Sequence, residues 1–127
     1  MRKIKFRAMM IGKKWVYGDY TVVNMGLDMY ECIVEREKES ATPIVLYTLG
    51  QYTGITDMNG TEIYEGDIVV ADSEYGDKIT DIVCWSYGSF YVANHTFKQI
   101  NNVEVIGNIY EHKHLLEENE NENKWIY

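Results

Sequence analysis

Residues 51–70 read QYTGITDMNGTEIYEGDIVV, and this stretch predicts short β-strands joined by two tight turns. Asn59-Gly60 has the residue types of a type I′ hairpin turn, in which both central residues have positive φ. Asp57 can accept hydrogen bonds from nearby backbone amides, and Glu65-Gly66-Asp67 marks the second turn. Residues 68–71, IVVA, then leave that turn as a strand.

The rest of the chain repeats this pattern of short strands separated by single glycines. Residues 3–8, KIKFRA, alternate between cationic and apolar side chains, which is typical of a half-buried strand. Eleven Tyr and three Trp are spread over the 127 residues, and both residue types favour half-buried pleated surfaces. The spacing of the strands therefore indicates a mostly β fold, either a barrel or a roll.

A hairpin is predicted over residues 82–95, with Gly88-Ser89 as its turn. In that register Trp85 lies opposite Val92. The face assigned to the core then holds Val83, Trp85, Tyr87, Phe90 and Val92. The opposite face holds Ile82, Cys84, Tyr91, Ala93 and His95.

The composition indicates a cytoplasmic protein without a membrane partner. No stretch approaches the ~20 apolar residues of a membrane span. Residues 8–11 form an apolar run of only four, whereas a signal peptide has an apolar core of about 7–15 residues. Cys32 and Cys84 are far apart and form no Cys-x-x-Cys motif, which favours two buried thiols over a disulfide.

Three segments of the chain share their motifs with one family. The central segment contains Gln51, Tyr52, Thr53, Gly54, Asp57, Asn59, Gly60, Ile63, Tyr64, Glu65, Gly66, Asp67, Ile68 and Val69. The outer segments are residues 4–8 and 105–111, which read IKFRA and VIGNIYE. Together they resemble the YopX family, a group of small proteins of phages and prophages. Met9 stands where the family often has Trp, a difference that bears on local packing.

The resemblance implies an SH3-type small β-barrel or roll, with no assigned activity and no catalytic residue. We therefore expect short antiparallel strands in a single β domain over residues 1–116. Within it, strands of residues 1–50 pack on an SH3-like barrel of residues 51–111. Residues 117–123 contain only Glu and Asn, so residues 117–127 are expected to form an acidic tail.

The motif residues are expected to serve mainly the structure. Gly54, Gly60 and Gly66 fit turn positions, and the carboxylates on either side of Gly66 can cap backbone amides. An alternative is that Tyr52 and Tyr64 form an aromatic rim that binds a peptide or a nucleic acid.

The acidic cluster around Asp57 and Glu62 does not have the spacing of a calcium loop. An EF-hand needs glycine at its sixth position and a bidentate Glu at its twelfth. Counted from Asp57, Gly60 falls at the fourth position and Ile68 at the twelfth. A plain hairpin turn explains the cluster better.

Two further groups of side chains are weighed as reactive sites. His112 and His114, with His95 elsewhere, lack the four ligands that zinc sites usually have, so surface histidines are the better account. Cys84 and His95 share a face in the predicted hairpin, but no third residue is placed to orient them. The sequence therefore predicts no enzyme: no catalytic residue, no metal ligand and no cofactor.

The charge is distributed unevenly along the chain. The first fourteen residues carry +6, and since the net charge is −8 the remainder carries −14. We expect the cations of Lys3, Lys5 and Arg7 to be neutralised within the protein or its oligomer. Our leading hypothesis is that the chain is an uncharacterised phage or prophage accessory protein that binds another macromolecule. We expect the partner to be an unknown protein with a basic surface, and self-association is a further option. The alternative is an SH3-like module that binds nucleic acid through the basic N-terminal strand, although the negative net charge argues against it.

Overall fold

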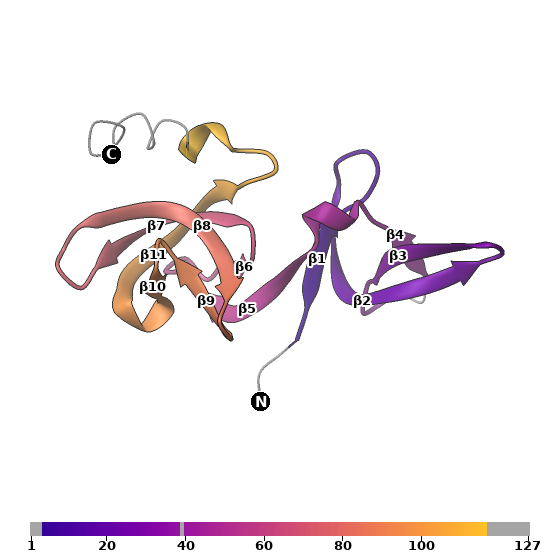
Figure 1. The fold of residues 1–127 in the computed structure, drawn as a ribbon, viewed down its shortest axis with the longest axis horizontal. Coiled ribbons are helices and arrows are strands. Elements are labelled where there is room, and N and C mark those ends of the chain that lie inside the picture. The colour runs from indigo at the N-terminus through magenta and orange to yellow at the C-terminus, as the bar shows by residue number, and fades with distance from the viewer. Residues whose placement is uncertain (1–3, 39, 117–127) are drawn as a thin grey trace. The chain divides into compact units, whose positions relative to one another are not determined.

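The computed structural model describes residues 4–38 and 40–116, and these residues are mostly β-structure, as predicted (Figure 1). In chain order the elements are β1 (Phe6–Met9), β2 (Trp15–Met25), β3 (Asp28–Val34), β4 (Ala41–Pro43), the 3-10 helix η1 (Leu46–Thr48), β5 (Gly50–Thr56), β6 (Glu62–Tyr64), β7 (Asp67–Ser73), β8 (Lys78–Ser86), β9 (Ser89–Val92), β10 (His95–Thr96), the 3-10 helix η2 (Phe97–Gln99) and β11 (Ile100–Asn108). Lys3 and the predicted acidic tail of residues 117–127 lie outside the described residues.

The strands form two antiparallel sheets, in the orders β4-β3-β2-β1-β5-β6 and β10-β9-β8-β7-β11. Each order ends in two edge strands, so the described part of the chain contains no closed barrel, and the barrel prediction is wrong. The second sheet stays open because its outer strands, β10 and β11, do not pair with each other. It is also staggered, since residues 78–82 of β8 pair with β7, whereas residues 83–86 pair with β9.

The chain divides into two compact units, Met1–Gly54 and Ile55–Tyr127. In the first unit β1 is a central strand, paired with β2 on one side and β5 on the other. The helix η1 fastens β1, because Thr48 Oγ1 accepts a hydrogen bond of 2.8 Å from the Met9 backbone N–H. The buried core of this unit contains Ala8, Val16 and Ile33.

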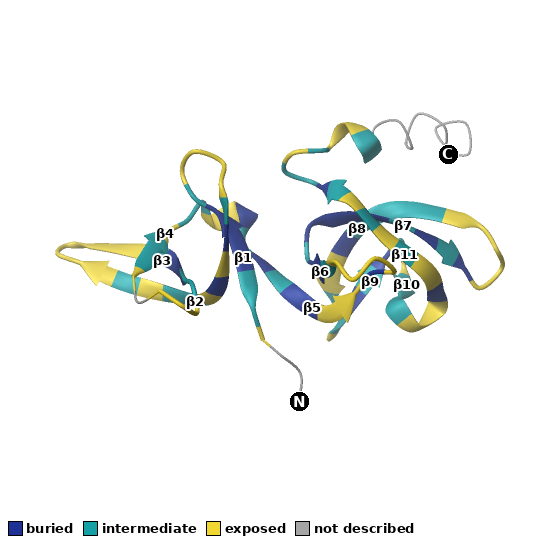
Figure 2. Cartoon of the chain, turned by 180° about the vertical axis from the view of Figure 1, so that it is seen from behind, coloured by how far each residue is buried: buried dark blue, intermediate teal, exposed yellow. Residues whose placement is uncertain are grey.

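The second unit is organised around β7, β8 and β9, and in β9 and the second half of β7 buried residues alternate with partly exposed ones (Figure 2). Such alternation is expected where one face of a sheet packs on a core. The buried core cluster consists of Ile63, Val69, Ala71, Val83, Phe90, Val92 and Ile100.

The hairpin of β8 and β9 forms, but its turn is Tyr87-Gly88 rather than Gly88-Ser89. Tyr87 has a φ of 48° and Gly88 a φ of 79°, which are the two positive values of a type I′ turn. As a result Trp85 lies opposite Phe90 instead of Val92. The predicted register is therefore wrong, because the chain turns one residue earlier than expected.

The predicted core face of this hairpin is correct for Val83, Phe90 and Val92, which are buried. It is wrong for Tyr87, which is 97% exposed because it lies in the turn itself. It is also wrong for Trp85, which is 48% exposed and contacts the Phe90 ring edge-on, with 4.7 Å between ring centroids.

The turn between β5 and β6 is a hairpin turn, as predicted, but not of type I′. Gly60 has a φ of 84°, whereas Asn59 is not among the residues with positive φ. The Gly60 N–H donates to the Asp57 carbonyl over 3.0 Å, and the Asp57 N–H donates to the Thr61 carbonyl over 2.8 Å. This is a three-residue loop in which only the final residue is left-handed.

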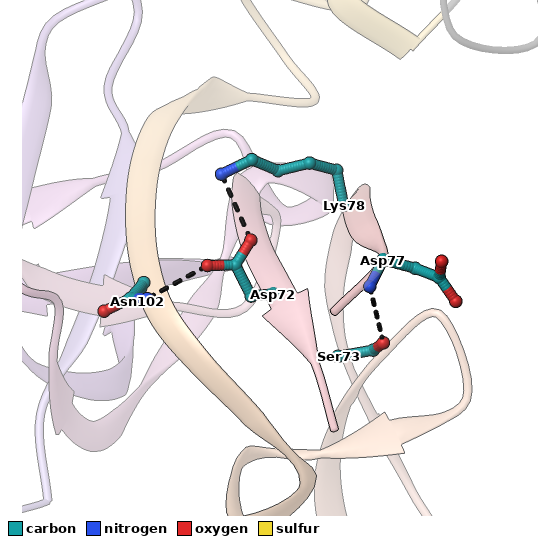
Figure 3. Close-up of polar contacts among 5 residues, drawn as sticks. All are labelled: Asp72, Ser73, Asp77, Lys78 and Asn102. Carbon is teal, nitrogen blue, oxygen red and sulfur yellow. Dashed lines mark hydrogen bonds and ion pairs between the residues drawn. The ribbon is translucent and has the colours of Figure 1, made fainter. Parts of the chain in front are cut away.

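Polar side chains fix the irregular part of β11 to the end of β7 (Figure 3). Asp72 accepts a hydrogen bond of 2.9 Å from Asn102 Nδ2 and forms an ion pair of 3.1 Å with Lys78. The Asn102 amide and the Lys78 ammonium lower the pKa of Asp72, because both stabilise its charged form. Ser73 Oγ accepts from the Asp77 N–H over 3.1 Å and so holds the loop before β8.

Candidate protein-docking surface

The carboxylate of Asp57 organises the central motif of the second unit. Its Oδ1 accepts hydrogen bonds from the backbone N–H groups of Asn59 and Thr61, at 2.8 and 2.9 Å. Its Oδ2 accepts from the Val105 N–H at 2.9 Å. Burial by itself would raise the pKa of Asp57, but the three backbone hydrogen bonds outweigh it and lower that pKa. Asp57 is thus a buried structural carboxylate, and the predicted bonding to nearby amides is confirmed.

The turn at Gly66 joins the central motif to the last one. Gly66 has a φ of 89°, and a Cβ at this position would lie 3.0 Å from Cε2 of Tyr110. Its carbonyl accepts a hydrogen bond of 2.8 Å from the Ile109 N–H. On the other side of the turn, Asp67 Oδ2 accepts from the Tyr64 N–H at 2.8 Å. Only glycine combines this backbone conformation with such a close aromatic neighbour.

The other motif residues lie in strands or turns of their own unit. Gln51 lies opposite Phe6 in the pairing of β5 with β1, and Thr53 is buried in β5. Gly54 has a φ of 86°, and Ile63 belongs to the core cluster. Glu65 lies in the turn between β6 and β7.

Tyr52 and Tyr64 do not offer exposed rings. Tyr64 is only 2% exposed, and its hydroxyl donates to Glu62 Oε1 over 3.0 Å. Tyr52 is also buried, and its N–H donates to the Lys5 carbonyl over 2.7 Å. The aromatic rim proposed for these two side chains therefore has no surface to occupy.

The N-terminal cations pack on aromatic rings. Arg7 is 7% exposed, and its guanidinium carbon lies 4.6 Å from the centroid of the Trp15 ring. Lys5 Nζ lies 5.4 Å from the centroid of the Tyr52 ring. The expectation that residues 3–8 form a half-buried strand with a cationic surface is wrong for Arg7, because the Trp15 ring of the neighbouring strand β2 packs on its guanidinium.

Cys84 and His95, which the sequence analysis considered as a reactive pair, do not contact each other. The Cys84 thiol contacts the Ile82 carbonyl and His95 Nδ1 contacts the Ala93 carbonyl, so no dyad is present among the described side chains. Partial desolvation of the thiol and the charges of Asp81 and Glu65 raise the pKa of Cys84, which is opposite to what a nucleophile needs. Cys84 is exposed, contrary to expectation, whereas Cys32 is buried. Within residues 4–38 and 40–116 no cluster of His, Cys, Asp and Glu could hold a metal ion.

A long two-stranded ribbon in the first unit carries a group of exposed apolar side chains. β2 and β3 pair with each other beyond the point where β1 and β4 end. We call this extension, residues 22–31, the arm. Figure 2 shows the outer end of this hairpin as exposed. Five of the ten arm residues are exposed and apolar: Val22, Met25, Leu27, Met29 and Tyr30. Leu27, at the tip, is 104% exposed.

The apolar side chains of the arm occupy both of its faces. By the strand register, Val22 and Met29 share one face, whereas Met25 and Tyr30 share the other. A ribbon of this kind has no core of its own, and two strands alone are marginally stable in water. Exposed apolar patches on a folded domain commonly mark contacts with another macromolecule.

All charged residues of the arm are acidic. Asp28 lies at its tip, and Glu31 lies at its base. Glu31 Oε1 accepts from the Tyr20 hydroxyl over 3.0 Å, whereas its buried Oε2 accepts no hydrogen bond from the described residues. That hydrogen bond, burial and the Glu31 charge together raise the pKa of Tyr20. The base of the arm therefore holds one buried carboxylate oxygen that receives no hydrogen bond from the described residues.

The arm was not predicted as a binding site from the sequence, although the charge pattern of the chain contained one indication of it. Residues 15–35 contain four acidic residues and no Lys or Arg, next to a strongly basic N-terminus. The sequence could not show that β2 and β3 are longer than the strands beside them in the sheet. The exposure of the arm follows from that difference in strand length.

Comparison with known proteins identifies the family. The sequence profile described as YopX protein matches residues 5–117, so the chain belongs to the YopX family. The crystal structure of protein EF1440 from Enterococcus faecalis is similar, with a TM-score of 0.56 and 24% sequence identity, over 91% of this chain and 99% of that one. At that identity the likeness concerns the fold. No curated protein matches the chain. None of the described helices is long and apolar enough to cross a membrane.

Proposed function

We propose that this member of the YopX family is a phage or prophage accessory protein that acts in the bacterial cytoplasm by binding another protein and catalyses no reaction. The single observation that carries the proposal is the arm, an acidic ribbon with exposed apolar side chains on both faces. We also propose that the second unit is an SH3-type roll, as the family motifs imply. The open, staggered sheet of that unit supports the assignment to a roll. Such small β modules commonly act through exposed loops and strand edges.

The chemistry of the arm selects a partner surface that is apolar and basic. Met25, Leu27 and Met29 can adapt to an irregular apolar surface, since Met side chains are flexible and polarizable. The exposed carboxylate of Asp28, at the tip, favours a cationic group beside that surface and repels phosphate groups. A second copy of the arm would bring like charges together, so a different protein is the better partner.

The nucleic-acid alternative receives no support from the packing of the cations. Arg7 is buried against Trp15, and Lys5 lies over the ring of Tyr52. Phosphate binding rests on clustered cations that can reach the nucleic-acid backbone. A buried guanidinium does not provide such a contact.

The test uses an arm variant in which Leu27→Ser and Met29→Ser are combined. Both side chains are exposed, so the fold should tolerate the change. The matched control combines Ile11→Ser and Tyr75→Ser, which remove equally exposed apolar side chains outside the arm. Tagged wild-type, arm-variant and control chains serve as bait in nuclease-treated bacterial lysate, and any captured protein is then purified and titrated directly.

We expect to capture a protein that binds the wild type and the control with similar affinity and binds the arm variant at least ~10-fold more weakly. A tenfold weaker affinity corresponds to a loss of about 1.4 kcal/mol of binding free energy. Affinity should also fall between about 50 and 200 mM salt, because the partner is basic. Equal capture by the arm variant would contradict the proposal. Loss of a wild-type dimer in the arm variant, seen by light scattering, would replace the foreign partner with a second copy.

A further inference from the structure

The outer face of the hairpin of β8 and β9 carries a hollow of about 400 Å³. It lies on the face opposite the core side chains Val83, Phe90 and Val92. The side chains that matter for its chemistry are Asp81, Cys84, Tyr87, Tyr91 and Asn94. This hollow belongs to the second unit and shares no residue with the arm.

The hollow is electrostatically negative. Apart from burial, the charges of Asp81 and Glu65 raise the pKa of the Cys84 thiol, so both carboxylates act at this position. Asp81 Oδ1 accepts a hydrogen bond of 2.7 Å from the Ile82 N–H, and its second oxygen has no hydrogen-bond donor among the described residues. Within the described part of the chain, no Lys or Arg lines the hollow. A cation would therefore meet an available carboxylate oxygen there.

Tyr87, which lines the hollow, has a strained backbone conformation. It is almost fully exposed and has a φ of 48°, a conformation that bulky residues rarely adopt. Asn followed by Gly is the preferred pair for a type I′ turn, so stability alone does not explain a tyrosine at this position. Strained residues of this kind are often retained for function.

We propose that this hollow binds the side chain of an arginine presented by a peptide segment of a protein. The guanidinium would donate to the free oxygen of Asp81, and its planar face would lie against the rings of Tyr87 and Tyr91. The protonated Cys84 thiol supplies a neutral floor. This site is separate from the arm, so it stands or falls independently of the function proposed above.

The test uses acetyl-Gly-Arg-Gly-amide as the probe and the citrulline peptide as its neutral isostere. The full chain is titrated with each peptide and followed by NMR at Tyr87, Tyr91 and Cys84. We expect the arginine peptide to bind in the millimolar range and to shift these three residues, with the citrulline peptide at least ~10-fold weaker. Binding should also lower the pKa of Cys84, read from thiolate absorbance, because the guanidinium offsets the Asp81 charge.

Two variants remove one partner each without disturbing the core. Asp81→Asn keeps an oxygen for the Ile82 N–H and should weaken arginine binding ~10-fold. Tyr87→Asn should weaken binding severalfold while raising the melting temperature, since it relieves the strained φ. The matched controls are Asp77→Asn and Tyr75→Asn, which change exposed residues of the neighbouring loop and should leave binding unchanged.

The inference is overturned if the citrulline peptide binds as well as the arginine peptide, if the shifts map elsewhere, or if Asp81→Asn leaves the affinity unchanged. The arm variant with Leu27→Ser and Met29→Ser should bind the arginine peptide normally. Failure at the hollow therefore leaves the arm proposal standing, and the reverse also holds.

Discussion

The carboxylate of Asp57 accepts a hydrogen bond of 2.9 Å from the backbone N–H of Val105, 48 residues further along the chain. The same side chain holds the turn after β5 through the N–H groups of Asn59 and Thr61. One carboxylate thus connects a local turn to β11. Two segments that characterise the family, residues 51–69 and 105–111, meet at this residue.

We expect Asp57→Asn to lower the free energy of unfolding by about 2–3 kcal/mol, because hydrogen bonds to a buried charged acceptor are lost and an amide N–H is turned toward a backbone donor. Unfolding in urea measures the difference. Asp77→Asn, on an exposed carboxylate of the same unit, should change stability by less than about 0.5 kcal/mol. Equal stability of the two variants would contradict a structural role for Asp57.

Asp57 should also contribute to the acid sensitivity of the fold. Its pKa lies below the ordinary value of 3.8, because three backbone hydrogen bonds outweigh the effect of burial. A carboxylate with a lowered folded pKa stabilises the protein above its unfolded pKa, and this contribution is lost as the pH falls through the folded pKa. The wild type should therefore lose more stability than Asp57→Asn between about pH 5 and about pH 2. Parallel losses in the two proteins would argue against this assignment.

Gly60 and Gly66 should differ in how they tolerate a side chain. Both have positive φ, so Gly60→Val and Gly66→Val should each cost more than ~1 kcal/mol of stability. A Cβ at Gly60 meets no atom within 4 Å, whereas one at Gly66 lies 3.0 Å from the Tyr110 ring. Gly66→Ala should therefore be the more destabilising of the two alanine variants in thermal melts. Introducing Tyr110→Ala should remove the excess, and an excess that persists would exclude the ring contact as its cause.

Phe90→Ala should destabilise the protein more than Trp85→Ala, with Tyr91→Ala the mildest of the three. Phe90 is 6% exposed and belongs to the core, where loss of an aromatic ring costs about 3–5 kcal/mol. Trp85 loses an edge-on contact with Phe90 but is already half exposed. Urea midpoints of the three variants give the order. A larger loss at Trp85 than at Phe90 would mean that the hairpin register is not the one described.

Mixed-sequence DNA should not bind with micromolar affinity even at about 50 mM salt, where phosphate contacts are strongest. The physical reason is that Arg7 is buried against Trp15 and Lys5 packs on Tyr52. Fluorescence anisotropy at about 50 and 200 mM salt measures the affinity. Micromolar binding that disappears when Lys3→Glu and Lys5→Glu are combined would promote the nucleic-acid alternative over the protein partner.

The sequence by itself determined the features that depend on near neighbours. Period-two alternation placed Val83, Phe90 and Val92 on one buried face, although the predicted partners were displaced. This succeeded because the correct register and the predicted one differ by an even number of residues, which preserves the faces. Gly60 and Gly66 were recognisable as turn residues because positive φ is a local demand that glycine meets. The amide contacts of Asp57 within its own turn were predictable for the same reason.

Tertiary structure decided which residues are covered and which remain free. Arg7 looks like a surface cation in its alternating strand, but it is buried because the Trp15 ring of the neighbouring strand β2 packs on its guanidinium. The arm looks like an ordinary hairpin, yet it is exposed because β2 and β3 extend past the strands beside them. The bond from Val105 to Asp57 likewise depends on where β11 runs. Burial and long-range contacts depend on strand order and strand length, which no local pattern in this chain encodes.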